Sequence, residues 1–567
     1  MGGGGANLLD SPETGNNSGF EGVDEDPKKE GVTTWTTPTY KTYQEYFTDN
    51  NYTKESLTED DLSGKGTREE PYVLSSTKGF MLFFNYSLCN IDYTNKYVEL
   101  ACDVVLNDEK FDKDGNPSGG DGVIYAWYSL KANGLIFNGN GHTISGLYQN
   151  NETETDKAGM FIAVQSGSYL SNFKLVNLYI NSYVDKTQGY NGYVGALTRY
   201  LGGSTIENCY IEGAVKGGAV GGIAGYSSTT STKILNCSTN LNIFATHGGG
   251  LVSISWGADC YNCTTNGEIN GSYVGGIICD MQFGGRIEKC ISVANLKSKG
   301  ATGGMIARSF HNSTALRLYR YEVIDCEVRG SISSSGYCVG GLSAFMSQSF
   351  YVENFKLTTN VSGYSSSLLF GVVYDNTFAI IKNVTIKFDA QNGHVPPICY
   401  YSSASNKFLE NAQMIFDGMS VDIKNINFAN RLTILMVTHY GCDFSLSNAE
   451  INMKGNLYPI FFYGQNNSAT EMRKLKNVIC NFDSNGDASA SSYVKYDSIG
   501  MLMEGVLINY KNAKKEQKFY YGDDFSAFFV DWKNGKIGLK SNTANGFFQK
   551  TLTEDILTNK GYIKTFV

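Results

Sequence analysis

Five cysteines are spaced so regularly that their chemistry has to be considered first. They recur at intervals of 28, 26, 27 and 36 residues, at Cys209, Cys237, Cys263, Cys290 and Cys326. Zinc ligation is disfavoured because the CxxC pair Cys260 and Cys263 has no second ligand pair at a suitable spacing. Disulfides are disfavoured because a continuous column of five thiols leaves one unpaired. We therefore predict a structural ladder of small, buried, free thiols.

Carboxylates are the groups that would cleave a polysaccharide. Glycoside hydrolysis needs two of them about 5–9.5 Å apart. Two residues before the cysteines stand Glu207 and Glu288, which would lie three repeats, roughly 14 Å, apart. The other acids of the repeats have no evident partner: Glu212, Asp259, Glu268 and Asp280. We predict no catalytic residue. A polysaccharide lyase or glycoside hydrolase, with its site between protomers or within residues 346–510, is the alternative.

A basic, aromatic insertion lengthens the last cysteine interval and gives the candidate binding site. Arg binds carboxylate or phosphate bidentately, and aromatic faces stack on apolar surfaces. We expect a projecting loop that contacts a sugar or an anionic partner; the alternative is an ordinary solvated loop on the flank. The candidate ligand-binding residues are Arg308, Phe310, His311, Arg317, Tyr319, Arg320 and Tyr321.

Other kinds of chemistry find little support. The histidines show no metal-ligand spacing, so neither a metal nor another cofactor is expected: His142, His247, His311, His394 and His439. The formal charge is −9 and the pI about 5.3, which disfavours a nucleic-acid partner. No run of 18 apolar residues occurs, so no membrane-spanning helix is expected.

The elements that carry these residues follow from the repeat around each cysteine. An apolar residue stands three positions before it, as at Ile206, and a Gly-Gly pair comes later, as at Gly221–Gly222. The odd spacing requires a bend, where Asn208 and its counterparts Asn236 and Asn262 tolerate the left-handed conformation. The glycine pairs would form a second corner through positive φ. Units this short must stack on one another, which is typical of a solenoid.

Composition favours strands rather than helices. The chain has 567 residues, with 64 Gly, 38 Tyr and 32 Phe and only 18% charged residues. Aromatic and β-branched residues suit a pleated, half-buried surface. Taken with the repeats, this predicts an all-β fold: a right-handed parallel β-helix of roughly a dozen rungs, with rungs about 4.8 Å apart, a disordered N-terminal tail and a small C-terminal cap.

Three motifs resemble a known family. They are the segment from Gly66 to Leu74 (GTREEPYVL), the turn from Phe137 to Leu147 (FNGNGHTISGL), and the later GG[IL]xG repeats. They look like the GLUG-type right-handed β-helix of surface proteins from gut Bacteroidales, over roughly residues 66–345. The resemblance implies a parallel β-solenoid used for surface attachment, and it implies no catalytic residue.

The chain divides into five regions on these patterns. They are 1–35, an acidic, Gly-rich disordered tail or tether; 36–131, an N-terminal cap with the first rungs; 132–345, the regular solenoid; 346–510, an irregular continuation; and 511–567, a cap or oligomer contact. The last region should contain a hairpin around Asn534-Gly535 and a short helix at 553–558. Residues 1–35 lack the pattern of a signal peptide.

These observations predict a non-enzymatic, surface-exposed solenoid that recognises a cell-surface glycan or protein. Two settings fit: a tethered bacterial surface adhesin, or a fibre or spike protein of a phage virion. Attachment to a virion or formation of a homo-oligomer would use residues 1–35 or 511–567.

Overall fold

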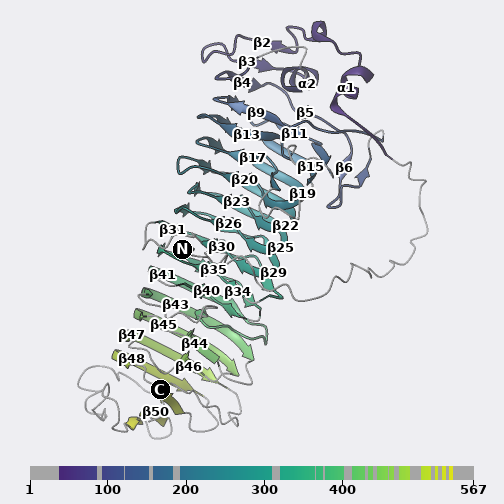
Figure 1. The fold of residues 1–567 in the computed structure, drawn as a ribbon. Helices are drawn as coiled ribbons and strands as arrows, with labels where there is room; N and C mark the ends of the chain where they lie inside the picture. Colours follow the sequence, from purple (N-terminus) through teal and green to yellow (C-terminus); the bar gives the residue numbers. More distant parts are fainter. Residues whose placement is uncertain are drawn as a thin grey trace, which may run out of the picture. The chain divides into compact units, whose positions relative to one another are not determined.

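A computed structural model describes the chain from residue 38 to residue 540. The undescribed residues inside that range are 86–91, 120–121, 152–157, 183–191, 310–318, 337, 364, 375–376, 401–411, 428–431, 439–442, 457–458, 465–471, 485–499, 512–517, 522–525 and 532–535. Parallel strands from successive rungs stack on each other throughout (Figure 1). The predicted all-β solenoid is therefore confirmed.

Each regular rung consists of a short strand, a long strand and a second short strand. The first group comprises β10 (Ile136–Asn138), β14 (Tyr169–Ser171), β18 (Thr205–Glu207), β21 (Lys233–Leu235), β24 (Asp259–Tyr261), β27 (Gly285–Glu288), β31 (Arg320–Ile324) and β36 (Ser349–Glu353). The long strands include β15 (Lys174–Ser182), β19 (Tyr210–Gly221), β22 (Ser238–Gly249), β25 (Thr264–Gly275) and β29 (Asn295–Gly303).

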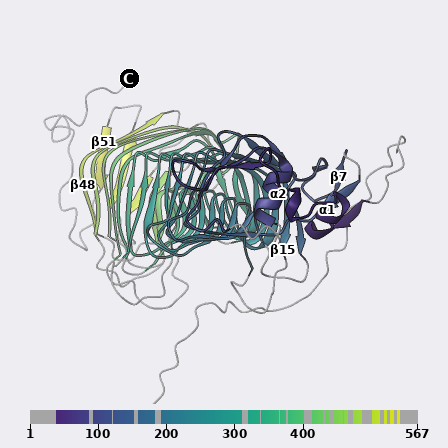
Figure 2. The same cartoon turned by 90° about the horizontal axis from the view of Figure 1, so that it is seen from above.

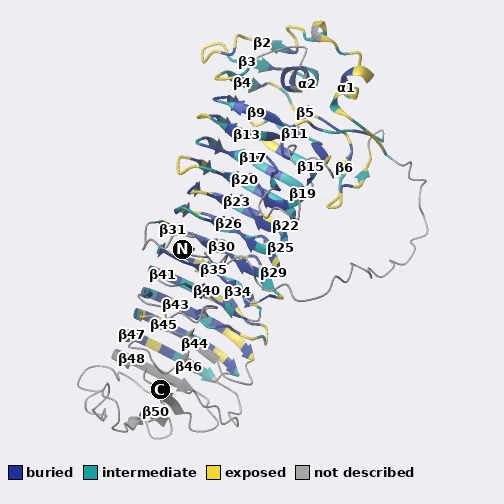
Figure 3. Cartoon of the chain, in the orientation of Figure 1, coloured by how far each residue is buried: buried dark blue, intermediate teal, exposed yellow. Residues whose placement is uncertain are grey.

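The second short strands form a sheet of their own with twelve members, which agrees with the predicted dozen rungs. They are β9 (Leu130–Asn133), β13 (Phe161–Gln165), β17 (Thr198–Leu201), β20 (Ala224–Ser227), β23 (Val252–Ser255), β26 (Ile278–Met281), β30 (Ile306–Ser309), β35 (Ser343–Met346), β40 (Phe370–Val373), β42 (Cys399–Tyr400), β44 (Leu432–Thr438) and β46 (Pro459–Gly464). Figure 3 colours most residues of the stacked strands as buried or half-buried.

The corner between the first two strands is made by left-handed residues, as predicted. Asn208, Asn236 and Asn262 have φ of 53°, 52° and 52°. Asn208 donates from Nδ2 to Oδ1 of Asn172 one rung below at 3.0 Å, and Asn262 donates to Asn236 at 2.8 Å. The amide ladder therefore joins rungs as well as permitting the turn. Further along the stack, Lys289 occupies the same left-handed position.

The cysteine ladder lies just inside this corner. All five side chains are at most 2% exposed, and the thiols are free. The thiol of Cys263 donates to the carbonyl of Tyr261 at 3.3 Å and to that of Ile234 in the rung below at 3.4 Å. The other four thiols repeat this pattern. The structure thus places these five side chains as buried, free thiols packed between rungs.

Thiol chemistry provides a test of this placement. Burial raises the pKa of Cys326 to about 12, which disfavours the reactive thiolate. In the folded protein, N-ethylmaleimide should modify the partly exposed Cys102 and leave the ladder unmodified; after denaturation the ladder should react as well. Peptide mass spectrometry measures both. Rapid labelling of Cys237 or Cys263 without denaturant would contradict the buried column.

The glycine corner occurs where it was predicted but for a different physical reason. None of the glycines in the five corner pairs has a positive φ; these pairs are Gly221–Gly222, Gly249–Gly250, Gly275–Gly276, Gly303–Gly304 and Gly340–Gly341. Instead, a Cβ on Gly249 would lie 1.9 Å from the carbonyl oxygen of Val252, and one on Gly250 would lie 2.1 Å from that of Gly276. The expectation of left-handed backbone was wrong, because the constraint is close approach of backbone within and between rungs.

The N-terminal end carries two helices that the sequence patterns did not indicate. They are α1 (Tyr43–Asp49) and α2 (Thr77–Asn85), and α2 begins where the Ser76 hydroxyl accepts a 2.9 Å bond from the amide of Gly79. Phe80 of α2 is fully buried and stacks near Trp127. Figure 2 shows both helices at the opposite end of the stack from β48 (Gly500–Lys511). Helix α2 of the N-terminal region thus packs against the core of the first rungs.

The later part of the stack holds the longest strands of the described chain. They are β43 (Gln413–Asn427), β45 (Asp443–Asn456) and β47 (Met472–Ser484), paired with β41 (Phe378–Asp389) and β48. Asparagine corners continue there at Asn383, Asn448 and Asn477. The region at 346–510, which was expected to be irregular, therefore keeps the asparagine corner of the regular rungs. It lacks the Gly-Gly pair of the second corner.

At the C-terminal end the structure describes the two strands of the predicted hairpin, whereas its turn at Asn534-Gly535 lies outside the described residues. Strands β50 (Ser526–Asp531) and β51 (Lys536–Lys540) pair antiparallel, with Asp531 opposite Lys536. The predicted tail at 1–35 and the predicted helix at 553–558 lie outside the described residues.

Candidate functional site

The structure agrees with only part of the predicted ligand-binding loop. Tyr321 is fully buried, and its hydroxyl donates to the carbonyl of Gln282 at 2.8 Å, so it cannot contact a ligand at the surface. Phe310, His311 and Arg317 lie outside the described residues. Arg320 has an exposed side chain whose Nε contacts Glu322 at 2.7 Å. This part of the prediction failed for Tyr321 because that residue already belongs to a strand, β31.

Arg308 also has a structural partner. Its Nε donates to Oδ1 of Asp280 at 2.6 Å, its second nitrogen contacts Oδ2, and its guanidinium lies 4.0 Å from the ring centre of Tyr273. Burial alone would raise the pKa of Asp280, but the charge of Arg308 and its hydrogen bonds outweigh burial and hold that pKa below its usual range. The two residues are register partners on β26 and β30. This pair therefore joins adjacent rungs.

His247 belongs to the same cluster and gives it a pH dependence. Its ring stacks on Tyr273 with centroids 5.0 Å apart. Burial lowers the pKa of His247 to about 4, with the opposed charges of Asp280 and Arg308 acting as smaller influences.

The unfolded chain consequently binds a proton at His247 that the folded chain does not, between pH values of about 6.5 and 4. Folding stability should fall by about 3 kcal/mol as pH decreases through this window. Chemical denaturation at pH 7 and pH 4.5 measures the change, and His247→Phe should reduce it. An equal pH dependence in the variant would contradict this account.

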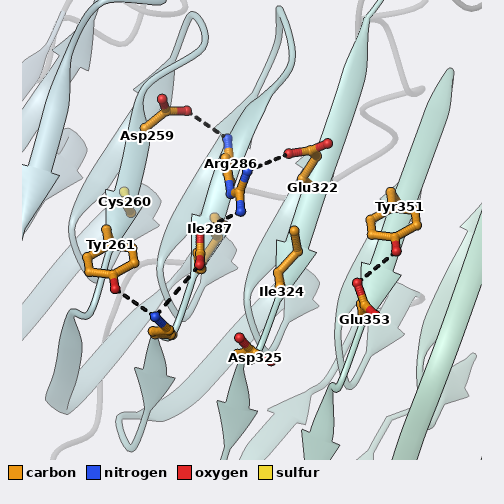
Figure 4. A network of polar contacts seen from close by, with 12 residues as sticks. Asp259, Cys260, Tyr261, Arg286, Ile287, Glu322, Ile324, Asp325, Tyr351 and Glu353 are labelled. Carbon is orange, nitrogen blue, oxygen red and sulfur yellow. Dashed lines mark hydrogen bonds and ion pairs between the residues drawn. The ribbon is translucent and has the colours of Figure 1, made fainter.

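A charged network covers the outer face of β24, β27, β31 and β36 (Figure 4). Arg286 contacts Glu288 at 2.6 Å and Glu322 in the next rung at 3.5 Å, and its backbone amide donates to Asp259 at 3.1 Å. Burial raises the pKa of Asp259, and the charge of Glu322 adds to the effect. The arrangement gathers three acids around Arg286: Glu288 and Glu322 form ion pairs with its guanidinium, and Asp259 accepts from its backbone amide.

Most of this network lies in one sequence column, because Asp259, Arg286 and Glu322 each stand four residues before a cysteine of the ladder. Glu322 is the register partner of Arg286, whereas Glu288 stands two residues before its cysteine and is the partner of Ile324. The column two residues before the cysteines does not reveal the network, but the column four residues before them does. Among the described residues, no group of three His, Cys, Asp or Glu side chains is arranged to hold a metal ion.

A second surface feature is a continuous row of aromatic rings, here named the aromatic stripe. It contains Tyr200 of β17, Tyr226 of β20, Trp256 after β23, Phe283 after β26 and Tyr319 before β31. Neighbouring ring centroids lie 5.8, 5.5, 4.8 and 5.2 Å apart. Trp256 is 39% exposed and the others are half-buried. The stripe therefore offers ring surface to solvent across successive rungs.

Polar groups accompany the stripe. The indole Nε1 of Trp256 donates to the amide oxygen of Gln282 at 2.9 Å, and the hydroxyl of Tyr200 bonds to that of Ser228. The Gln282 amide nitrogen and the Tyr226 hydroxyl make no hydrogen bond to the described part of the chain. A ligand could therefore contact both ring surface and open hydrogen-bonding groups here.

A shallow groove of about 540 Å³ follows the asparagine corner. Its lining includes Asn138, Asn172, Asn208, Lys174 and Tyr210. Most of these amides already bond along the ladder, so the groove is a weaker candidate than the stripe.

Comparisons with known proteins add little to these features. No family model and no curated protein matches the chain. A solved structure from Bacteroides ovatus, a putative immunoglobulin A1 protease, aligns with 53% of this chain and 86% of its own chain, at 19% identity and a TM-score of 0.33. Similarity at this level supports no statement about site or activity. Neither helix of the described chain is long and apolar enough to cross a membrane.

Proposed function

We propose that this protein is a non-enzymatic, surface-exposed solenoid that recognises a cell-surface ligand along its flank. The aromatic stripe is the observation that carries the proposal. Exposed Trp and Tyr side chains are enriched in recognition surfaces because they give large contact area at low conformational cost. A rigid stack of rungs holds these rings in place before a ligand arrives, which reduces the entropy cost of binding.

Two biological settings follow from this proposal. The chain is a tethered bacterial surface adhesin or a fibre or spike component of a phage, with a glycan or protein of the cell surface as partner. The GLUG-like motifs support either setting, since that family is used for surface attachment. Residues 1–35 or 511–567 would provide virion attachment or an oligomer contact. Tyr319 of the stripe and Arg320 remain proposed ligand contacts. Phe310, His311 and Arg317, which lie outside the described residues, remain proposed contacts as well.

Binding of the fluorescently labelled protein to Bacteroidales cells tests the proposal. We expect saturable binding that excess unlabelled protein displaces. Treating the cells with periodate, which oxidises sugar diols, or with protease identifies the ligand as glycan or protein. Absence of saturable binding to every strain of a capsule-diverse panel would contradict recognition of a cell surface in this order of bacteria.

A polysaccharide depolymerase is the second candidate, and one observation favours it. Asp259 has a raised pKa and lies beside other carboxylates, as a general acid in a glycosidase does. Against this candidate, Glu288 and Glu322 both form ion pairs with Arg286. Neither carboxylate is therefore available as the second catalytic group. If activity were found, Asp259→Asn should abolish it.

A further inference from the structure

We propose that the aromatic stripe binds a neutral pyranose chain laid across successive rungs of the solenoid. This inference rests on the proposed recognition function and adds the chemical class of the ligand and the residues that contact it. The stripe spans five successive rungs, through Tyr200, Tyr226, Trp256, Phe283 and Tyr319. An extended polymer is the ligand shape that such a row can follow.

The spacing of the rings comes from the backbone. Tyr200 and Tyr226 are register partners on neighbouring parallel strands, so their rings are separated by one rung, about 4.8 Å along the axis. The amide of Trp256 bonds to the carbonyl of Ser227, and that of Gln282 bonds to the carbonyl of Ser255. In the next rung Ile254 is the register partner of Tyr226, so Trp256 lies two residues further along the chain than that position, and Phe283 lies one residue beyond the counterpart of Trp256. The row therefore crosses successive rungs at an angle to the stacking direction, and its rings stay in contact from rung to rung.

Edge-to-face packing holds the rings rigidly. Tyr226 meets Trp256 at an interplanar angle of 76°, and Trp256 meets Phe283 at 62°. Tyr193 also stacks on Tyr226, with a centroid distance of 5.0 Å. Such contacts limit side-chain motion before binding, so ordering the site costs little entropy when a ligand binds.

The polar groups beside the rings indicate a carbohydrate rather than an apolar peptide. A pyranose has C–H faces that pack on aromatic rings and hydroxyl edges that both donate and accept hydrogen bonds. Gln282 provides a side-chain amide donor, and Tyr226 provides a hydroxyl that can donate or accept. An apolar segment would cover these groups without satisfying them, which costs free energy.

The charges near the stripe favour a neutral ligand over an anionic one. Arg320 is paired with Glu322 at 2.7 Å, and Arg308 with Asp280. Cations already engaged by carboxylates of the same chain offer little net attraction to an anionic sugar. Ring stacking and neutral hydrogen bonds then remain as the contacts that select the ligand.

Affinity electrophoresis tests this inference with defined probes. The full-length protein is run in native gels with and without dissolved xylan, mixed-linkage β-glucan, galactomannan or dextran. At least one neutral polysaccharide should retard the protein, and Trp256→Ala should weaken that binding about tenfold or more. Trp256→Phe should restore much of it, and Tyr226→Phe should weaken it less than Trp256→Ala does.

The matched control is Tyr128→Ala, which removes an aromatic side chain of similar exposure, 41%, away from the stripe. It should bind as the wild type does, and far-UV circular dichroism should show all variants folded. Wild-type retardation unaffected by Trp256→Ala would overturn the stripe as the site but leave the recognition function standing. Failure of all four neutral polysaccharides, with cell binding that protease removes and periodate does not, would overturn the ligand class alone. Chain shortening by the wild type would overturn the recognition function itself.

Discussion

Replacing Asp280 with alanine should destabilise the middle of the solenoid by about 3 kcal/mol, because it removes the counter-charge of a largely buried guanidinium. Asp280 is 3% exposed, and the Arg308 side chain that it contacts is 15% exposed. Breaking such a pair from one side costs more than the pair itself contributes, since the desolvated cation stays in place.

Local opening is the appropriate readout because each rung contacts mainly its neighbours. Native-state hydrogen exchange of amides in β26 and β30 measures the free energy of opening there. The control is Glu268→Ala, which removes an exposed ion pair with Lys297 of 3.0 Å and should cost less than about 1 kcal/mol. If both variants lowered the free energy of opening by less than about 1 kcal/mol, the buried pair would stabilise the contact between rungs no more than an exposed pair does.

Substituting alanine for Gly275 should destabilise the stack by about 4 kcal/mol or more, since backbone rather than a flexible side chain occupies the space. An added Cβ would lie 1.9 Å from the carbonyl oxygen of Ile278 and 3.0 Å from the amide nitrogen of Ala307 in the next rung. Neither group can move without breaking the corner or the parallel ladder.

Gly167→Ala separates this effect from backbone strain. Gly167 has a φ of 77°, yet nothing lies within 4 Å of the position that an added Cβ would take. That substitution should therefore cost only about 1–2 kcal/mol, the penalty for a left-handed non-glycine residue. Chemical denaturation measures both variants. A larger loss for Gly167→Ala than for Gly275→Ala would contradict the view that close approach dictates the glycine pairs.

The repeat could be predicted from sequence because each rung places the same kind of residue at the same point. Asn262 forms the corner of one rung and Cys263 is buried beside it, and Asn236 and Cys237 do the same in the rung below. Periodicity alone was therefore enough to locate the first corner. The glycine corner was located equally well, but its cause was not. Positive φ is a local property, whereas the constraint on Gly250 comes from Gly276 of the next rung.

The candidate site was harder to predict because it depends on register across rungs. Arg308 has the sequence context of a loop residue, and its pairing with Asp280 becomes visible only from the register of the two strands. Tyr321 is buried because it belongs to a strand, which its sequence context does not reveal. The stripe was missed because its rings do not share one offset. A signal was nevertheless present: Tyr226, Trp256 and Phe283 follow their Gly-Gly pairs by four, six and seven residues.

Size-exclusion chromatography with light scattering tests the central claim most directly. A Bacteroidales capsular polysaccharide is incubated with the purified protein, and the polymer mass is followed over time. Non-enzymatic recognition predicts chains of unchanged mass for every polysaccharide tested, with the protein co-eluting on those that it binds. Progressive shortening of the chains, abolished by Asp259→Asn, would contradict the account and establish a depolymerase.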